Sequence, residues 1–221
     1  MKWTSATLDG GAIAETDAAL SAPRALLLRL AGGSGQSKAF LRSNRGTLVD
    51  VSAKSHLAVS FSMRVDSAPF PVADGGGFMH VALVELDEPS CNSTPSGTQR
   101  QIEVSLFPSG SVGAALKGVR DLCPNDAGDF TSLSSPAKPV DFAKKFRRIT
   151  LDVSRRPCSG SSAEAAVRFA VEGFSEVGCQ SLGKGDPFAH GMALTVQLGL
   201  FASGTWGDTA IAYDDVSVDF D

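Results

Sequence analysis

Acidic side chains at the end of one predicted strand are the first candidates for chemistry. Glu85, Asp87 and Glu88 close the apolar segment 78–87 and stand directly before Pro89. Retaining hydrolysis of a glycosidic bond needs two carboxylates about 5 Å apart on either side of the reacting bond. Alternation along a strand places Glu85 and Asp87 on one face, whereas Glu88 has the opposite parity. The spacing therefore favours residues at a solvated rim over a hydrolytic pair.

A second possible chemistry is proton abstraction by a lyase, for which a histidine or tyrosine must lie beside arginine and glutamine. Six candidate ligand-binding residues have strand parities that could place them on one polar sheet face: Arg64, His80, Glu103, Arg148, Arg168 and Gln197. The only tyrosine, Tyr213, belongs to the terminal strand. The alternative, which we favour, is a solvated outer face with scattered charges, because antiparallel sheets commonly expose one polar side.

Trp206, in the segment SGTWGD, is a further candidate for ligand binding. An exposed tryptophan can stack on a sugar ring or anchor an interface. It can equally pack back against its own loop. The chain has two tryptophans and one tyrosine, so it is poor in the aromatic platforms that sugar-binding proteins use.

Asp214 and Asp215 are candidate ligands for calcium, which binds six to eight oxygen atoms. On a regular strand Asp214 shares the parity of Val216 and Val218 and would face the core. A carboxylate in that position needs hydrogen-bond donors or a cation. The alternative to calcium is that Asp214 accepts hydrogen bonds from backbone N–H groups or from an arginine.

The four cysteines lie in stretches rich in Pro, Ser, Gly and Asn, and none has the spacing of a zinc site. We predict two disulfides, Cys91–Cys123 and Cys158–Cys179, each closing a hairpin-like excursion. Two other pairings are possible, and four buried free thiols are a further alternative. Disulfides would indicate an oxidising compartment.

The elements that must position these residues are short strands. Apolar residues recur with a period of two, most regularly over 56–66, 146–156 and 163–173. Similar patterns predict strands over 3–8, 24–30, 38–42, 78–87, a hairpin over 100–118, and a final hairpin over 192–220 whose turn is the cluster 202–208. The segment 21–30 also suits a short amphipathic helix. Residues 119–144 form a long polar insertion, which is typical of a functional or disulfide-held loop.

Ten or more strands without a long helix, a repeat or a composition shift predict an all-β fold: one antiparallel two-sheet β-sandwich spanning residues 1–221. The formal net charge of −4 argues against nonspecific nucleic-acid binding. No apolar run reaches the roughly 18 residues that span a bilayer. The first residues lack the apolar core of a signal peptide, so the protein is cytosolic or its targeting segment is missing from this sequence. The cysteines favour the second case.

Several segments in this order match a known family. The most specific are LDVS followed by VRFAVEG, and the ending GLFASG with YDDVSV. The chain resembles the concanavalin A-like lectin/glucanase jelly roll, in particular laminin-G-like domains of bacterial secreted proteins and lipoproteins. The resemblance implies binding of carbohydrate or protein, with calcium in some members. It also implies pairing of the first and last strands, which would bring Asp9 to the calcium candidates. Glycoside hydrolases and polysaccharide lyases share the fold, so the fold alone does not choose among these functions.

We therefore expect a noncatalytic, extracytoplasmic binding module, secreted or surface-anchored, for carbohydrate or a cell-surface ligand. Calcium is the only cofactor expected. A glycan-active enzyme, either hydrolase or lyase, is the first alternative. A structural surface lipoprotein domain that contacts other proteins is the second.

Overall fold

The protein is built from strands in two layers. The computed structural model describes residues 3–9, 11–16, 21, 24–43, 48–49, 55–67, 78–88, 98–106, 112–119, 130–132, 142, 145–161, 166–173, 178–181 and 192–221. Every regular element in these ranges is a β-strand, which confirms the predicted all-β class. In particular, the segment 21–30, for which a helix was an alternative, contains a strand. None of the described segments forms a helix long and apolar enough to cross a membrane.

The first layer, sheet A, is eight-stranded, and its strands pair in antiparallel fashion. Its order is β1–β4–β14–β7–β8–β9–β10, with β5 also paired to β14. The bounds are β1 (Trp3–Asp9), β4 (Gly33–Ser43), β5 (Leu48–Val49), β7 (Phe78–Glu88), β8 (Thr98–Leu106), β9 (Val112–Val119), β10 (Phe130–Ser132) and β14 (Met192–Trp206).

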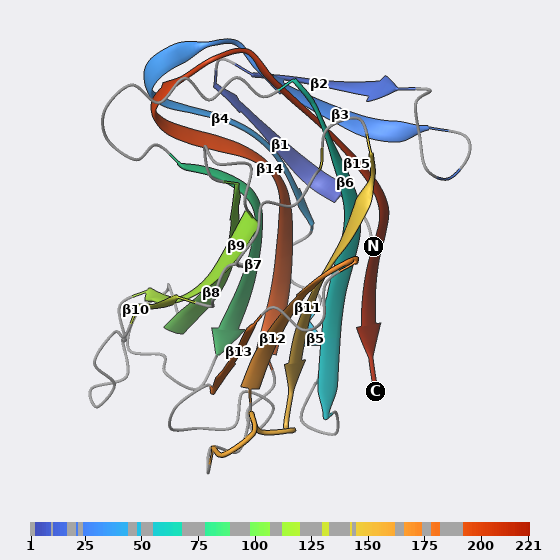
Figure 1. Cartoon of the computed structure of the whole chain (residues 1–221), viewed down its shortest axis with the longest axis vertical. Coiled ribbons are helices and arrows are strands. Elements are labelled where there is room, and N and C mark those ends of the chain that lie inside the picture. The colour runs from blue at the N-terminus through green and yellow to red at the C-terminus, as the bar shows by residue number, and fades with distance from the viewer. Residues whose placement is uncertain are drawn as a thin grey trace.

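The second layer, sheet B, is seven-stranded and also antiparallel, in the order β13–β12–β11–β6–β15–β3–β2. The two layers are visible in Figure 1, where β11, β12 and β6 lie in front of the curved strands of sheet A. The bounds are β2 (Gly11–Thr16), β3 (Ala25–Leu30), β6 (His56–Ser67), β11 (Arg147–Ser154), β12 (Ala166–Val171), β13 (Gly178–Ser181) and β15 (Thr209–Phe220).

The core lies between the sheets and follows the predicted period of two. Phe61 of β6 and Phe169 of β12 are fully buried, as is Leu198 of β14 from the other sheet. These side chains belong to one apolar cluster that draws on both layers. Removing such a surface from water is the main favourable term in folding. Each inward residue therefore fixes the opposite, outward face of its strand, where the polar residues stand.

The final hairpin is tighter than the sequence predicted. β14 continues to Trp206, which pairs with Gly33 of β4, so the predicted turn over 202–208 is wrong. Only Gly207 and Asp208 separate β14 from β15. The Asp208 carboxylate accepts a hydrogen bond from the Gly32 backbone N–H (2.7 Å), which ties this turn to the start of β4. The pairing with β4 extends the strand through a Gly/Ser/Thr cluster that looked like a turn.

The predicted disulfide Cys158–Cys179 is confirmed. It links the segment after β11 to β13, which follows β12. The other predicted disulfide, Cys91–Cys123, lies outside the described residues, so it stays a prediction. The confirmed bond agrees with an oxidising compartment.

Candidate functional site

The residues singled out in the sequence do not share one surface. Arg64, Arg148 and Arg168 lie in sheet B, on β6, β11 and β12. His80, Glu103 and Gln197 lie in sheet A, on β7, β8 and β14. The interpretation of all six as one polar face is therefore wrong. Parity within a strand says which residues share its face, but not which sheet the strand joins.

A stripe of basic and aromatic residues follows β4 on the face of sheet A that is turned away from sheet B, which we call the outer face. Lys38, Phe40 and Arg42 alternate there with Ala39, which is fully buried against the core. Lys38 and Phe40 are half-buried. Arg42 is in direct register with Gln197 of the neighbouring strand. Directly opposed residues of antiparallel strands have Cβ atoms about 5 Å apart, so the backbone brings these two residues together.

Gly199 stands in the middle of this arrangement, opposite Phe40. A Cβ atom on Gly199 would lie 2.3 Å from the Ala39 carbonyl oxygen and 2.4 Å from Cδ1 of Phe40. Only glycine fits there, because those distances are far below van der Waals contact. The Phe40 ring therefore lies close over the backbone of β14, flanked along its own strand by Lys38 and Arg42.

His80 joins the same face because of an irregularity in β7. On a regular strand His80 would share the parity of Ala82, which is in register with the fully buried Val104. The register of β7 shifts between His80 and Ala82, so His80 pairs with Ser105 on one side and Phe201 on the other. Such bulges re-aim a residue and are frequent near active sites. The shift places His80 on the outer face.

The remaining sheet A candidates lie around this group. Glu103 is opposite Leu83, which is itself opposite Gln197, so these three residues form one row across the sheet. Glu85 faces Thr195 and Gln101, and Glu88 lies at the end of β7 opposite Thr98. Trp206 is the last residue of β14 and not part of a loop. Its role as a sugar platform stays a prediction.

In sheet B, Arg64 is held by its neighbours. Its guanidinium donates two hydrogen bonds to Asp66 (Nε–Oδ1 2.5 Å, Nη2–Oδ2 2.8 Å) and lies 4.8 Å from the centre of the Phe146 ring. The hydrogen bonds that Arg64 donates to the Asp66 carboxylate raise the pKa of Arg64. A bidentate ion pair of this kind fixes the guanidinium in place. Arg64 therefore has a structural role at one end of β6.

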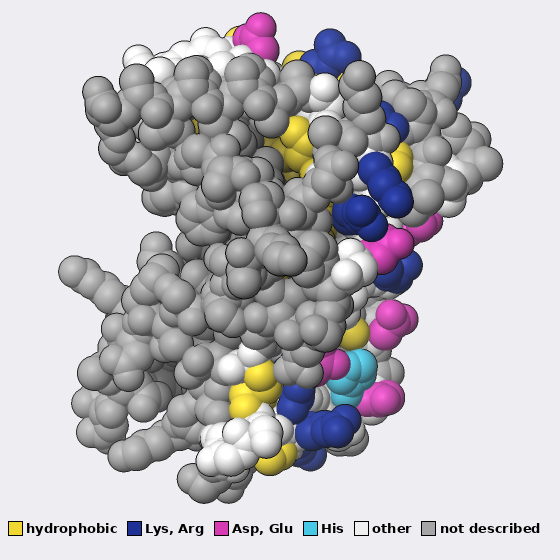
Figure 2. All heavy atoms as spheres, viewed as in Figure 1, with side chains coloured by type: hydrophobic (Ala, Val, Ile, Leu, Met, Phe, Trp, Pro, Cys, Tyr) yellow, Lys and Arg dark blue, Asp and Glu magenta, His cyan; other side chains and the backbone are white. Residues whose placement is uncertain are grey.

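Arg148 and Arg168 border two separate depressions on the outer face of sheet B. Arg148 donates to the Ser60 hydroxyl (2.7 Å) and lines a depression of about 480 Å³ with Asp215. Arg168 lines a depression of about 530 Å³ at the other end of β11, together with His56 and Asp152. Figure 2 shows basic, acidic and histidine side chains gathered toward the lower right of that view.

The environment of Asp214 differs from the predicted one. The register of β15 shifts between Asp214 and Ser217, so Asp214 pairs with Ser62 on the outer face of sheet B. The expectation that it faces the core with Val218 is wrong. Asp214 is nevertheless 8% exposed, and its carboxylate accepts hydrogen bonds from the Ser21 backbone N–H and hydroxyl (both 2.9 Å) and from the Asp215 N–H (2.8 Å). These donors match the alternative to calcium.

Asp9 does not reach the other two aspartates. It lies on β1, opposite Lys38 of sheet A, whereas Asp214 and Asp215 lie on β15 of sheet B. The first and last strands therefore do not pair, and the predicted three-aspartate set is wrong. Within the described residues, no group of three or more His, Cys, Asp or Glu side chains is arranged to hold a metal ion. Calcium binding by Asp214 and Asp215 stays a prediction.

Tyr213 is a core residue. Its side chain is 1% exposed, and its hydroxyl donates to the Gly199 carbonyl (3.2 Å) across the two sheets. Burial raises the pKa of the Tyr213 phenol well above its ordinary value. A buried neutral phenol with its proton engaged cannot reach a substrate. Since Tyr213 is the only tyrosine of the chain, any proton transfer at the outer face must use other residues.

Lys38, Phe40 and Arg42 were not predicted as site residues from the sequence. The signal was present in KAFLR, where these three residues alternate with Ala39 and Leu41. This alternation is a weak signal because the segment is short. The place of Arg42 in the site also depends on its pairing with Gln197, which the sequence does not show.

The fold is thus an antiparallel two-sheet β-sandwich with a basic and aromatic stripe on the outer face of one sheet. No family model matches the sequence, and no curated protein matches it. Solved structures do share the fold. An endo-β-1,4-glucuronan lyase from the fungus Trichoderma reesei aligns with a TM-score of 0.66 at 14% identity, over 98% of this chain and 90% of that one. A family PL-14 alginate lyase from Aplysia kurodai aligns at 0.60 and 13% identity, over 95% and 87%. An alginate lyase from Pseudomonas aeruginosa aligns at 0.50 and 14%, over 95% and 86%.

These comparisons correct the functional expectation. The three similar structures named above are polysaccharide lyases, which are enzymes. The expectations of a noncatalytic binding module and of a protein without enzymatic activity are therefore wrong. The predicted β-sandwich fold is confirmed, whereas nothing supports the laminin-G-like subtype. A cell-surface protein as partner is likewise unsupported.

Proposed function

We propose that the protein is a polysaccharide lyase that cleaves a uronic acid-containing glycan at the outer face of sheet A. The single observation that carries this proposal is the register shift in β7. It puts His80 on the face that already holds the Lys38–Phe40–Arg42 stripe and Gln197. The fold shared with glucuronan and alginate lyases supports it.

The chemistry of such a lyase is β-elimination. A base removes the proton from the sugar carbon next to the carboxylate, the bond from the neighbouring carbon to the glycosidic oxygen breaks, and a carbon–carbon double bond forms between those two carbons. The departing oxygen takes up a proton. Negative charge develops on the uronate carboxylate during the step, and positive groups placed there lower the barrier.

The proposed roles follow from position and residue type. His80 is the base, because imidazole accepts a proton near neutral pH and Tyr213 is buried in the core. Arg42 and Gln197, directly opposite each other, bind the uronate carboxylate, for which a guanidinium is suited. Phe40 provides an apolar surface for a sugar ring between Lys38 and Arg42. The disulfide and a polymeric substrate both support an extracytoplasmic, secreted location.

The experiment is a panel of alginate, glucuronan and a neutral glucan, followed by ultraviolet absorbance of the unsaturated product. We expect product from at least one acidic polymer and none from the neutral one. His80→Ala should lower kcat by at least about 100-fold, the usual contribution of a general base. Arg29→Ala is the control, because Arg29 is an exposed residue on the other sheet.

Two results would refute the proposal. One is the absence of unsaturated product from every acidic polymer under conditions where the protein is folded by circular dichroism. The other is a His80→Ala variant with wild-type kcat.

A further inference from the structure

A second charged site lies on sheet B, where the start of β6, the end of β11 and the start of β12 meet. The depression of about 530 Å³ found there is lined by three arginines, two aspartates, two serines and His56. These residues belong to sheet B or to the segments directly attached to it. The site is therefore separate from the outer face of sheet A.

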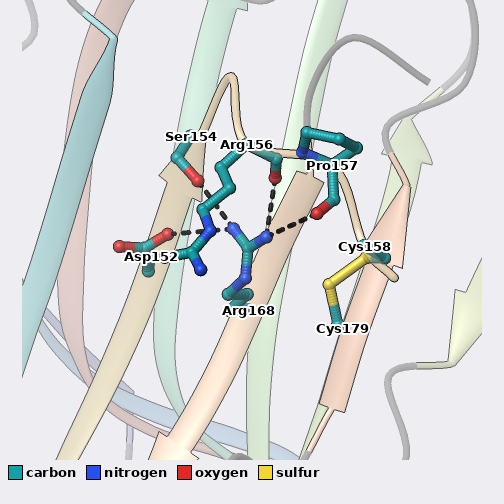
Figure 3. Close-up of a disulfide and its surroundings, with 7 residues drawn as sticks. All are labelled: Asp152, Ser154, Arg156, Pro157, Cys158, Arg168 and Cys179. Atoms are coloured by element: carbon teal, nitrogen blue, oxygen red, sulfur yellow. Dashed lines mark hydrogen bonds and ion pairs between the residues drawn. A yellow bond between two sulfur atoms is a disulfide. The ribbon is translucent and has the colours of Figure 1, made fainter. Parts of the chain in front are cut away.

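The floor of this depression is held by a connected polar network. Arg168 donates to the Ser154 hydroxyl (2.7 Å) and to the carbonyls of Arg156 (2.7 Å) and Pro157 (2.9 Å), and it lies 3.6 Å from Asp152. Figure 3 shows the Arg168 guanidinium between these groups. One donor group thus fixes both the strand end and the turn that follows it.

His56 extends the network across to β6 and to the end of β15. Its Nε2 hydrogen-bonds the second carboxylate oxygen of Asp152. Its Nδ1 lies 3.4 Å from the Asp221 carboxylate, which is largely exposed. Asp152 is therefore shared between an arginine and a histidine, so both of its oxygens are occupied by protein groups.

The rim of the depression is different, because it exposes positive charge. Arg155 and Arg156 are both exposed, on the turn after β11. Within the part of the chain that the structure describes, the Arg156 guanidinium has no hydrogen bond or ion pair. The disulfide Cys158–Cys179 ties this turn to β13 (Figure 3), which limits how far the two arginines can move. A fixed turn reduces the entropy lost on binding.

The balance of charge points to an anionic ligand. Among the lining residues that the structure describes, three arginines outnumber two aspartates, in a protein whose formal net charge is −4. The depression at the other end of β11 has the opposite balance, since its described lining contains one arginine, Arg148, and two acidic residues, Glu172 and Asp215. A local reversal of the overall charge attracts anions to this one place on the sheet.

We propose that this depression is a second binding site for acidic polysaccharide, in which the Arg155 and Arg156 guanidinium groups bind sugar carboxylates. The planar fork of arginine matches a carboxylate, and the polar floor offers His56 and Asp221 to sugar hydroxyls. The site would hold one stretch of a long chain while another stretch lies on sheet A. The identity of the ligand rests on the proposed function.

The test is electrophoresis of the protein through gels that contain alginate or glucuronan, with a neutral glucan gel as reference. His80→Ala serves as the background, so that the polymer is not cut during the run. We expect Arg155→Ala/Arg156→Ala to weaken retention in the acidic gel by about tenfold, as for the loss of a charge-assisted contact. Arg156→Lys should give an intermediate loss, because it keeps the charge but not the fork. Arg29→Ala, an exposed arginine on the same sheet, should leave retention unchanged.

The outcomes separate this site from the lyase activity. Equal retention of the double arginine variant and its background, with both folded by circular dichroism, would overturn the second site. Equal retention in acidic and neutral gels would do the same. If retention falls as expected but no polymer yields unsaturated product, the second site stands and the proposed lyase activity fails. Product formation without the fall in retention would give the reverse result.

Discussion

At the scale of the residue, Tyr213 and Gly199 show how the core and the candidate active face are coupled. The Tyr213 hydroxyl, from sheet B, donates to the carbonyl of Gly199 in sheet A. The opposite side of Gly199 meets the Phe40 ring. Gly199 therefore accepts a hydrogen bond from the core residue Tyr213 and contacts Phe40 on the outer face. A substitution at Tyr213 should therefore alter the position of Phe40, and the reverse, because packed interiors transmit strain.

Replacing Tyr213 with Phe tests the assignment of this tyrosine to the core. The buried Gly199 carbonyl loses its donor, so we expect a loss of about 1 kcal/mol in the free energy of unfolding at neutral pH. Product formation should persist, because the hydroxyl has no catalytic role. Urea denaturation and the product assay measure the two effects. A large fall in kcat in a variant that is still folded would show that Tyr213 has a catalytic role.

The same variant has a predicted pH dependence. Because burial raises the folded-state pKa of Tyr213, the neutral phenol is favoured in the fold. Its contribution to stability is complete below the unfolded pKa of about 10 and is lost as pH rises toward the folded pKa. The wild type should therefore lose stability above about pH 10, and Tyr213→Phe should lose less. Parallel pH profiles of the two proteins would contradict this account.

At the scale of the element, two register shifts decide where the polar residues stand. In β7 the shift moves His80 to the outer face of sheet A. In β15 the shift between Asp214 and Ser217 contains Asp215, the one described non-glycine residue with a positive φ (49°). Aspartate tolerates this left-handed conformation better than most side chains. An extra residue in one strand reverses the parity of everything beyond it.

Replacing Asp214 with Ala should destabilise this irregular part of β15. The Ser21 N–H and the Asp215 N–H would lose their acceptor, and we expect a cost of about 2 kcal/mol in the free energy of unfolding. Asp219→Ala is the matched control, since Asp219 is an exposed aspartate on the same strand and should change stability little. Thermal or urea unfolding measures both.

The same unfolding experiment, repeated with added calcium, tests the predicted calcium site. A rise in Tm on adding calcium to the wild type, absent in Asp214→Ala, would support the predicted ion site. A wild-type Tm that does not respond to calcium, together with a stability loss in Asp214→Ala, would assign the carboxylate to the hydrogen bonds alone.

The elements also show what the sequence can and cannot predict. The alternation of Leu57, Val59 and Phe61 with small residues, Ala58, Ser60 and Ser62, predicted β6 and its buried face correctly. Alternation is a local property, so it survives without knowledge of the partner strand. The bulges that decide the faces of His80 and Asp214 were not predictable, because a bulge exists only relative to a paired strand. The pairing of Arg42 with Gln197 was not predicted either, because it joins two strands that are far apart in the sequence.

At the scale of the whole molecule, the two layers carry different chemistry. The outer face of sheet A holds the proposed elimination site, and the outer face of sheet B holds the arginine-rimmed depression. A sandwich leaves both outer faces available, because only the inner faces are needed for the core. An identity of 14% with a TM-score of 0.66 shows that the layered pattern persists while most residues differ. Function must therefore be argued from the sites and not from the fold.

The disulfide provides the last prediction, because it separates folding from chemistry. Cys158 and Cys179 are 21 residues apart in sequence, and a loop of that size implies about 3 kcal/mol of stabilisation. The variant Cys158→Ser/Cys179→Ser should therefore unfold at lower urea concentration.

The disulfide lies beside the depression on sheet B. The strands β4 and β14, which carry the proposed active site, belong to the other sheet. Turnover of an acidic polymer at the sheet A face should then persist below the unfolding transition, while retention in an acidic gel weakens because the Arg155–Arg156 turn is no longer tied to β13. Loss of turnover in a variant that is still folded would show that the two layers do not act independently.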